Sequence, residues 1–91
     1  MKVVWRRAAL ADVGKAILYV VSESPSGATE IARRLRGAQT LLEQWPEIGR
    51  PAGSAMRRIL RVNRTPYFLV YELRADRLVI TAVIHHRENR R

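Results

Sequence analysis

The chain has 91 residues, 47% of them hydrophobic, so it is long enough for one small domain spanning 1–91 and too apolar for a disordered chain. It contains no cysteine, which excludes disulfides and thiolate metal sites. Neither its opening residues nor its short apolar runs match a signal peptide or a membrane span, and we expect a cytoplasmic protein. Its 17 basic and eight acidic residues give a net charge of +9, which predicts a polyanionic partner, either nucleic acid or an acidic protein segment.

The chain opens with a predicted strand and a predicted helix. Residues 2–5 (KVVW) are β-branched and aromatic, which is typical of a strand. Over residues 8–24, apolar side chains recur at helical spacing and predict an amphipathic helix of about four turns. The expected core-facing stripe of this helix is Leu10, Val13, Ile17 and Val21.

A second helix is predicted to follow almost at once. Ser24 is a good N-cap and Pro25 suits the first helical position. The helix should continue to about Trp45, because Pro46 then halts it. Its expected core-facing stripe is Ala28, Ile31, Leu35, Ala38, Leu42 and Trp45.

The second half of the chain changes to a period of two, which predicts strands. Residues 47–55 contain two glycines and one proline and are interpreted as a loop; strands are predicted at 56–62, 67–73 and 77–84. Short connections favour antiparallel neighbours. The predicted fold class is therefore α+β, in the order β-α-α-β-β-β, with a helical hairpin packed on one face of a mostly antiparallel four-stranded sheet.

Basic residues gather in the half of the chain that forms the sheet. Residues 50–91 carry ten basic and three acidic groups, a net charge of +7. Strand alternation places Arg57 and Arg61 on one side and Arg58 on the other, and Arg64 follows in the turn. The same alternation places His85 on the face opposite Leu78 and Ile80, which are expected under the helices. His85, Arg87, Arg57 and Arg61 could then meet on the uncovered face.

Such a cluster could hold a phosphate and move protons, since arginine stabilises developing negative charge and histidine titrates near neutrality. Other interpretations stay open. Arginines on an uncovered sheet face are usually only solvated, and His86 should face the helix side or the rim. Adjacent histidines on one strand cannot both ligate one metal, and no carboxylate cluster joins them, so we expect no metal and no cofactor.

Four segments in this order resemble the RelE/ParE superfamily of bacterial type II toxins: WPEIGRP, RRILRV, PYFLVYEL and VIHHR. The resemblance covers nearly the whole chain and is closer to ParE. It implies a plasmid-stabilising, growth-arresting toxin bound in a hetero-oligomer by a cognate DNA-binding antitoxin that is encoded next door. The implied target is DNA gyrase for a ParE-like member; for a RelE-like member it is the ribosome, where mRNA is cut.

The resemblance also implies roles for particular residues. In the RelE-like alternative, Arg57, Arg61 and Arg87 would clamp phosphate and His85 would relay a proton, so that the catalytic set is His85, Arg61 and Arg87. In either branch, target or antitoxin binding is expected at Arg57, Arg58, Arg61, Arg64, His85, His86 and Arg87. The chain has no tyrosine after His85, where many ribosome-dependent members carry one, and this favours the gyrase-directed branch. A basic structural module without toxicity is a third alternative.

Overall fold

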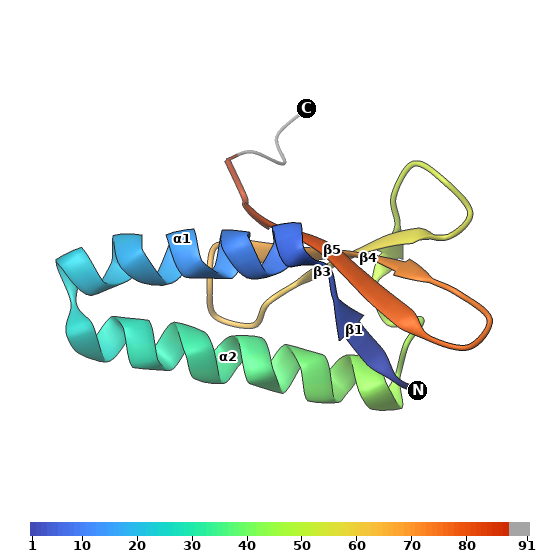
Figure 1. Cartoon of the computed structure of the whole chain (residues 1–91), viewed down its shortest axis with the longest axis horizontal. Helices are drawn as coiled ribbons and strands as arrows, with labels where there is room; N and C mark the ends of the chain where they lie inside the picture. Colours follow the sequence, from blue (N-terminus) through green and yellow to red (C-terminus); the bar gives the residue numbers. More distant parts are fainter. Residues whose placement is uncertain (88–91) are drawn as a thin grey trace.

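The computed structural model describes residues 1–87 and confirms the α+β class (Figure 1). The sheet has five strands where four were expected, because Arg50 and Pro51 of the expected loop pair with the following strand. The elements are β1 (Val3–Trp5), α1 (Arg7–Glu23), α2 (Pro25–Gln44), β2 (Arg50–Pro51), β3 (Arg57–Arg61), β4 (Tyr67–Leu73) and β5 (Leu78–His85).

The strands lie in the order β1-β5-β4-β3-β2. β1 runs parallel to β5, and the other neighbouring pairs are antiparallel. The two helices lie side by side as an antiparallel hairpin, and the connection between them extends beyond the sheet (Figure 1). No helix within residues 1–87 is long and apolar enough to cross a membrane.

The core-facing stripe of α1 agrees with the predicted one at Val13 but differs from it at both ends of the helix. Ala9 and Ala16 are buried, and Val13 and Val20 pack against the core. Leu10 and Val21, expected to be buried, are 55% and 42% exposed. Alanines permit a close approach of α1 to the sheet, and the larger side chains are left on the outer surface.

The α2 helix follows the prediction more closely. The Ser24 hydroxyl accepts a hydrogen bond from the Gly27 N–H at 3.2 Å, with Pro25 at the first helical position. The buried stripe contains Ala28, Ile31, Leu35, Ala38 and Leu42. Trp45 is 62% exposed, contrary to the prediction, because the helix ends at Gln44 and Pro46 redirects the chain before the indole can reach the core.

A β-bulge in β5 decides which side chains face the helices. Val70 pairs with Ala82 and Tyr71 pairs with Ile80, so Thr81 is an extra residue with no partner on β4. The Thr81 hydroxyl donates to the Val70 carbonyl at 3.2 Å. Because one residue is inserted, the alternation restarts after the bulge, and the side chains beyond it lie on the face opposite to the one that a strict period of two predicts.

Candidate functional site: the arginine face and the end of β5

The sheet face away from the helices consists of three cross-strand rows. Side chains that oppose each other in register share a face, and the rows follow from the strand pairing. They are Arg61–Phe68–Ile84, Arg50–Ile59–Val70–Ala82, and Arg57–Glu72–Val79–Val4. The face is therefore apolar in its centre and cationic along the β2–β3 side.

Arg57 and Arg61 lie on this face and are exposed, as predicted. Arg50 joins them, because it pairs with Ile59. The row of Arg57 also contains Glu72, which accepts a 2.6 Å hydrogen bond from Arg74 and lies 4.0 Å from Arg6. The positive surface is thus strongest at the Arg50 and Arg61 rows.

Arg58 lies on the opposite face, where its side chain hydrogen-bonds to the backbone of the segment between α2 and β2. It pairs with Tyr71, and its Nη1 donates to the carbonyls of Glu47 (3.1 Å) and Gly49 (2.6 Å). The buried Tyr71 hydroxyl donates to the Pro46 carbonyl at 2.8 Å and accepts from the Gly49 N–H at 2.9 Å. These bonds fix the segment between α2 and β2, and the binding role expected for Arg58 stays a prediction.

Gly49 is required in this arrangement because of a close approach. A Cβ built at Gly49 would lie 2.7 Å from the Tyr71 hydroxyl and 2.9 Å from the Ile59 carbonyl oxygen. Burial raises the pKa of the Tyr71 hydroxyl above its ordinary value, so the group stays protonated and keeps donating to Pro46.

The expected meeting of His85 with Arg57 and Arg61 is wrong. His85 pairs with Tyr67 and lies on the helix-facing side of the sheet, whereas Arg61 pairs with Phe68 and lies on the other side. The physical reason is the extra Thr81 in the bulge, which reverses the expected alternation. The four groups expected at one site therefore divide between two surfaces.

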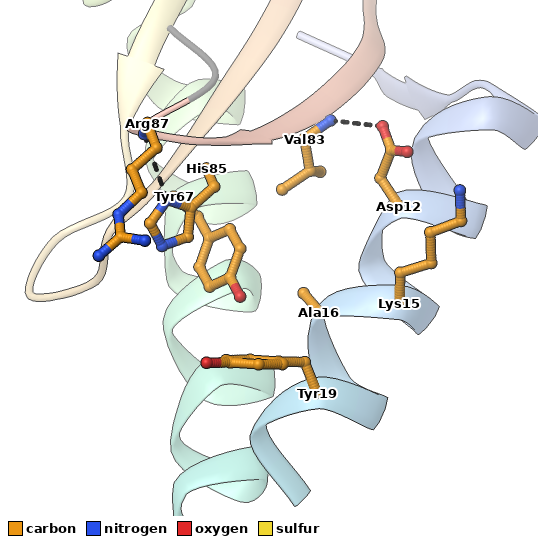
Figure 2. Close-up of a pocket in the computed structure, with 8 residues that line it drawn as sticks. All are labelled: Asp12, Lys15, Ala16, Tyr19, Tyr67, Val83, His85 and Arg87. Atoms are coloured by element: carbon orange, nitrogen blue, oxygen red, sulfur yellow. Dashed lines mark hydrogen bonds between the residues drawn. The ribbon is translucent and has the colours of Figure 1, made fainter. Parts of the chain in front are cut away.

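His85 and Arg87 instead line an open pocket of about 540 Å³ beside α1 (Figure 2). The His85 ring meets the Tyr67 ring edge-on, with centroids 5.4 Å apart. The Arg87 N–H donates to His85 Nδ1 at 3.2 Å, which places the proton of a neutral imidazole on Nε2. The pocket is lined by Asp12, Lys15, Ala16, Tyr19, Tyr67, Val83, His85 and Arg87.

On its helix side, the pocket is lined by one carboxylate that hydrogen-bonds to β5 and by two exposed side chains, Lys15 and Tyr19. Asp12 accepts a hydrogen bond from the Val83 N–H at 3.0 Å and so caps the edge of β5 beyond the end of β1 (Figure 2). Lys15 is exposed, and Tyr19 is 66% exposed. The pocket can therefore offer cations and an aromatic surface to an anionic partner.

The remaining predicted site residues lie at the ends of strands. Arg64 is exposed in the turn after β3, with a positive φ of 61°. His86 is exposed; its ring lies 5.0 Å from that of His85, and its N–H donates to the Pro66 carbonyl at 2.7 Å. Residues 1–87 contain no group of three or more His, Cys, Asp and Glu side chains that could hold a metal ion.

Comparison with known proteins agrees with this architecture. The family model described as "ParE toxin of type II toxin-antitoxin system, parDE" matches residues 3–90. The chain belongs to the ParE toxin family. A curated relative, Toxin RelE2 of Caulobacter vibrioides, is 38% identical over 85 residues, which are 93% of each protein. A solved structure titled "Chromosomal ParDE TA system from P. aeruginosa" superposes with a TM-score of 0.81 at 24% identity, covering 93% of this chain and 95% of that one.

Three polar residues of this ParE-family toxin were missed as site residues by sequence reasoning. Arg50 was assigned to a loop, although it directly precedes Pro51 in the GRP segment that carries the family resemblance. Lys15 and Tyr19 belong to the first predicted helix and were not considered as site residues. Their i, i+4 spacing was the available signal, because it places both side chains on one face of α1.

Proposed function

We propose that this ParE-family toxin arrests growth by inhibiting DNA gyrase and that a cognate antitoxin neutralises it. Membership of the ParE toxin family supports the toxin role. The observation that favours gyrase over mRNA cleavage is the placement of His85 and Arg61 on opposite faces of the sheet. A proton relay and a phosphate clamp must both reach one phosphodiester, and these two groups face away from each other.

The gyrase contact is proposed at the carboxyl end of β5. His86 and Arg87 are exposed there, and Arg87 lines the same pocket as exposed Lys15 and Tyr19 of α1. The predicted contact also includes residues 88–91, which lie outside the described residues. Arg64 is proposed as an additional binding residue because its turn lies beside the end of β5, where His86 bonds to Pro66.

The experiment that tests the function is inducible expression in a bacterial host, with two readouts taken before growth stops. Gyrase inhibition predicts induction of the DNA damage response and changed plasmid supercoiling, while reporter mRNAs keep their normal half-lives. Rapid cleavage of translated mRNA without a DNA damage response would instead support the RelE-like alternative. The Gly49→Ala variant serves as an inactive control, since its Cβ cannot fit without a backbone shift.

Two observations favour the RelE-like alternative, a ribosome-dependent mRNA endonuclease. His85, Arg87, Lys15 and Tyr19 line a single pocket, and the 38% identical relative is named a RelE toxin. In that function His85 would move a proton and Arg87 would bind phosphate, with Lys15 where Arg61 had been expected. His85→Ala would then abolish mRNA cleavage, since removing a general acid or base lowers a rate by about 10²–10⁴-fold.

The proposed physiological state is a cytoplasmic hetero-oligomer with an antitoxin encoded by the adjacent gene. The net charge of +9 favours an acidic partner segment. A neighbouring reading frame for a short protein with a DNA-binding part and an acidic segment would support this state. Co-expression of that reading frame should restore growth and yield a stable complex on size-exclusion chromatography.

A further inference from the structure

We propose that the side of α1 that faces away from the core is a self-association surface, on which a second copy of this chain docks with its own α1 antiparallel. Ala16 is buried, and because an α-helix turns once in 3.6 residues, Gly14 and Leu18 lie on the opposite side of the helix. The same spacing places Leu10 and Val21 on that side. Leu10, Gly14, Leu18 and Val21 are called the outer face of α1.

The outer face of α1 is apolar and uncovered. Leu10, Leu18 and Val21 are 55%, 70% and 42% exposed, and Tyr19 beside them is 66% exposed. Among residues 1–87, nine large apolar side chains are exposed, and four of them belong to this one helix. A single exposed apolar side chain is ordinary on a protein surface, whereas several that lie together are typical of a contact surface.

Gly14 leaves space in the middle of this face. A Cβ built there would meet nothing within 4 Å, so no close approach among residues 1–87 requires a glycine at this position. Glycine inside a helix is less favourable than alanine, because it loses more backbone freedom on folding. Lys15 is the midpoint of α1, so an antiparallel copy that overlaps the whole helix brings its Leu18 between Ala11 and Gly14. The glycine then receives a large side chain.

Charge favours a second copy over a polyanion as the occupant. Each copy has a net charge of +9, so two copies repel each other unless they meet where the surface is nearly neutral. Within residues 8–22 the helix carries one acid, Asp12, and one base, Lys15, and neither belongs to the outer face. A nucleic acid or an acidic protein segment would find no excess of cations there.

The charges at the two ends of α1 complement those of an antiparallel copy. Arg7 begins the helix and Glu23 ends it, and both are exposed. The first turn of α1 contains no acidic residue and the last turn no basic one, so both charges oppose the dipole of their own helix. Antiparallel pairing brings Glu23 of each copy level with the Arg7 end of the other. Each helix end thereby gains the charge that it lacks.

The size of the surface predicts a weak and reversible dimer. A helix of 17 residues is about 25 Å long, and contact along one face of it buries less than the roughly 800 Å² per partner of a standard stable complex. We therefore expect a Kd of about 1–100 µM for self-association. Sedimentation equilibrium of nuclease-treated toxin across this range should show monomer and dimer. Because the contact is apolar, the dimer should persist at high salt.

The first test places a charge on the outer face. Leu18→Glu should raise the Kd of self-association at least tenfold, because the carboxylate would have to be buried in the dimer. Ile48→Glu is the matched control, since Ile48 is a 47% exposed apolar residue in the segment between α2 and β2. It should change the Kd less than twofold. Circular dichroism checks that both variants fold. Equal values of Kd for Leu18→Glu and the unmodified toxin would overturn the surface.

The second test measures the direction of the two helices by disulfide formation. The chain contains no cysteine, so a single introduced thiol can pair only with that of another copy. A disulfide requires Cα atoms within about 7 Å of each other. Antiparallel pairing brings the two copies of position 14 together and holds those of position 22 about 20 Å apart along the helix. Gly14→Cys should therefore cross-link at least tenfold faster than Ser22→Cys under mild oxidation. Equal rates would overturn the antiparallel arrangement.

The same experiments distinguish other occupants of this face. A toxin that stays monomeric at every concentration overturns the pairing. If the antitoxin then binds Leu18→Glu at least tenfold more weakly than the unmodified toxin, the surface belongs to the antitoxin. Association that disappears after nuclease treatment would come from bridging RNA and would also overturn the pairing. Growth arrest is a separate readout, because loss of the dimer in Leu18→Glu does not depend on whether gyrase is the target.

Discussion

The imidazole of His85 meets the ring of Tyr67 edge-on, with centroids 5.4 Å apart and ring planes at 86°. This geometry is typical of aromatic packing. Tyr67 belongs to the buried core, and it lies on the helix-facing side of the sheet, where the bulge at Thr81 places His85. The histidine therefore lies on the opposite face of the sheet from Arg57 and Arg61.

His85→Ala is expected to fold and to keep most of the growth arrest. The loss of an aromatic contact should lower the free energy of unfolding by about 1 kcal/mol, measured by chemical denaturation. Toxicity, scored as colony formation after induction, should change less than tenfold. Asp76→Ala, at an exposed position in the loop before β5, is the matched control. A folded His85→Ala protein that loses all toxicity would point to proton transfer instead.

The bulge at Thr81 predicts opposite tolerance at two adjacent positions of β5. Val83 is buried against the helices. Ile84 is half-exposed on the other face of the sheet, in the cross-strand row with Arg61 and Phe68. Val83→Asp should lower the free energy of unfolding by more than about 3 kcal/mol, because it buries an unpaired charge. Ile84→Asp should leave a folded protein. Circular dichroism melts check both, and equal tolerance at the two positions would mean that the alternation has been assigned wrongly.

The fold was predictable from the sequence wherever local signals were strong. Ser24 and Pro25 marked the junction between the helices, and the alternation through 67–73 identified the central strand. The predicted α1 stripe shares Val13 with the observed one, but Ala9 and Ala16 are buried in place of Leu10 and Val21, because small side chains allow close packing under the sheet.

The candidate site was less predictable, because it depends on one inserted residue. Nothing in the apolar run from 78 to 84 marks Thr81 as unpaired, since threonine is an ordinary strand residue. The pairing of Arg50 with Ile59 and the bonds of Arg58 to backbone carbonyls are likewise tertiary features. Residue type alone therefore identified the basic groups but could not divide them between the two faces.

Tyr71→Phe is expected to destabilise the segment between α2 and β2. The exchange leaves the buried Gly49 N–H without its acceptor and the Pro46 carbonyl without its donor, which should lower the free energy of unfolding by about 1–3 kcal/mol. Urea denaturation at neutral pH measures this loss. A change below about 0.3 kcal/mol would show that water replaces both bonds at no net loss.

The same exchange should also alter the pH dependence of stability in alkaline solution. Burial raises the pKa of Tyr71 in the folded protein, whereas the unfolded chain loses this proton near pH 10. Above that pH the unfolded state binds fewer protons than the folded state, so stability falls as pH rises through the window between the two pKa values. The Tyr71→Phe protein should show a shallower decline over pH 9–11 than the unmodified protein. Identical slopes would contradict the raised pKa.

Arg87→Glu is expected to weaken the toxin without unfolding it. Arg87 is exposed at the edge of the pocket beside α1, and its side chain makes no ion pair among the described residues. Charge reversal should raise the concentration for half-inhibition of gyrase at least fivefold, and Arg77→Glu at the opposite end of β5 should change it less than twofold. Equal effects of the two variants would mean that only net charge matters.

The most direct measurement is the supercoiling of relaxed plasmid by purified gyrase in the presence of the purified toxin. We expect the toxin to block supercoiling, and its antitoxin to restore it when both proteins are added together. In a parallel translation reaction, ribosome-bound mRNA should remain uncut. Undisturbed supercoiling at a large molar excess of folded toxin over gyrase, together with cleavage of the translated mRNA, would contradict the gyrase assignment and make the pocket at His85 a nuclease site.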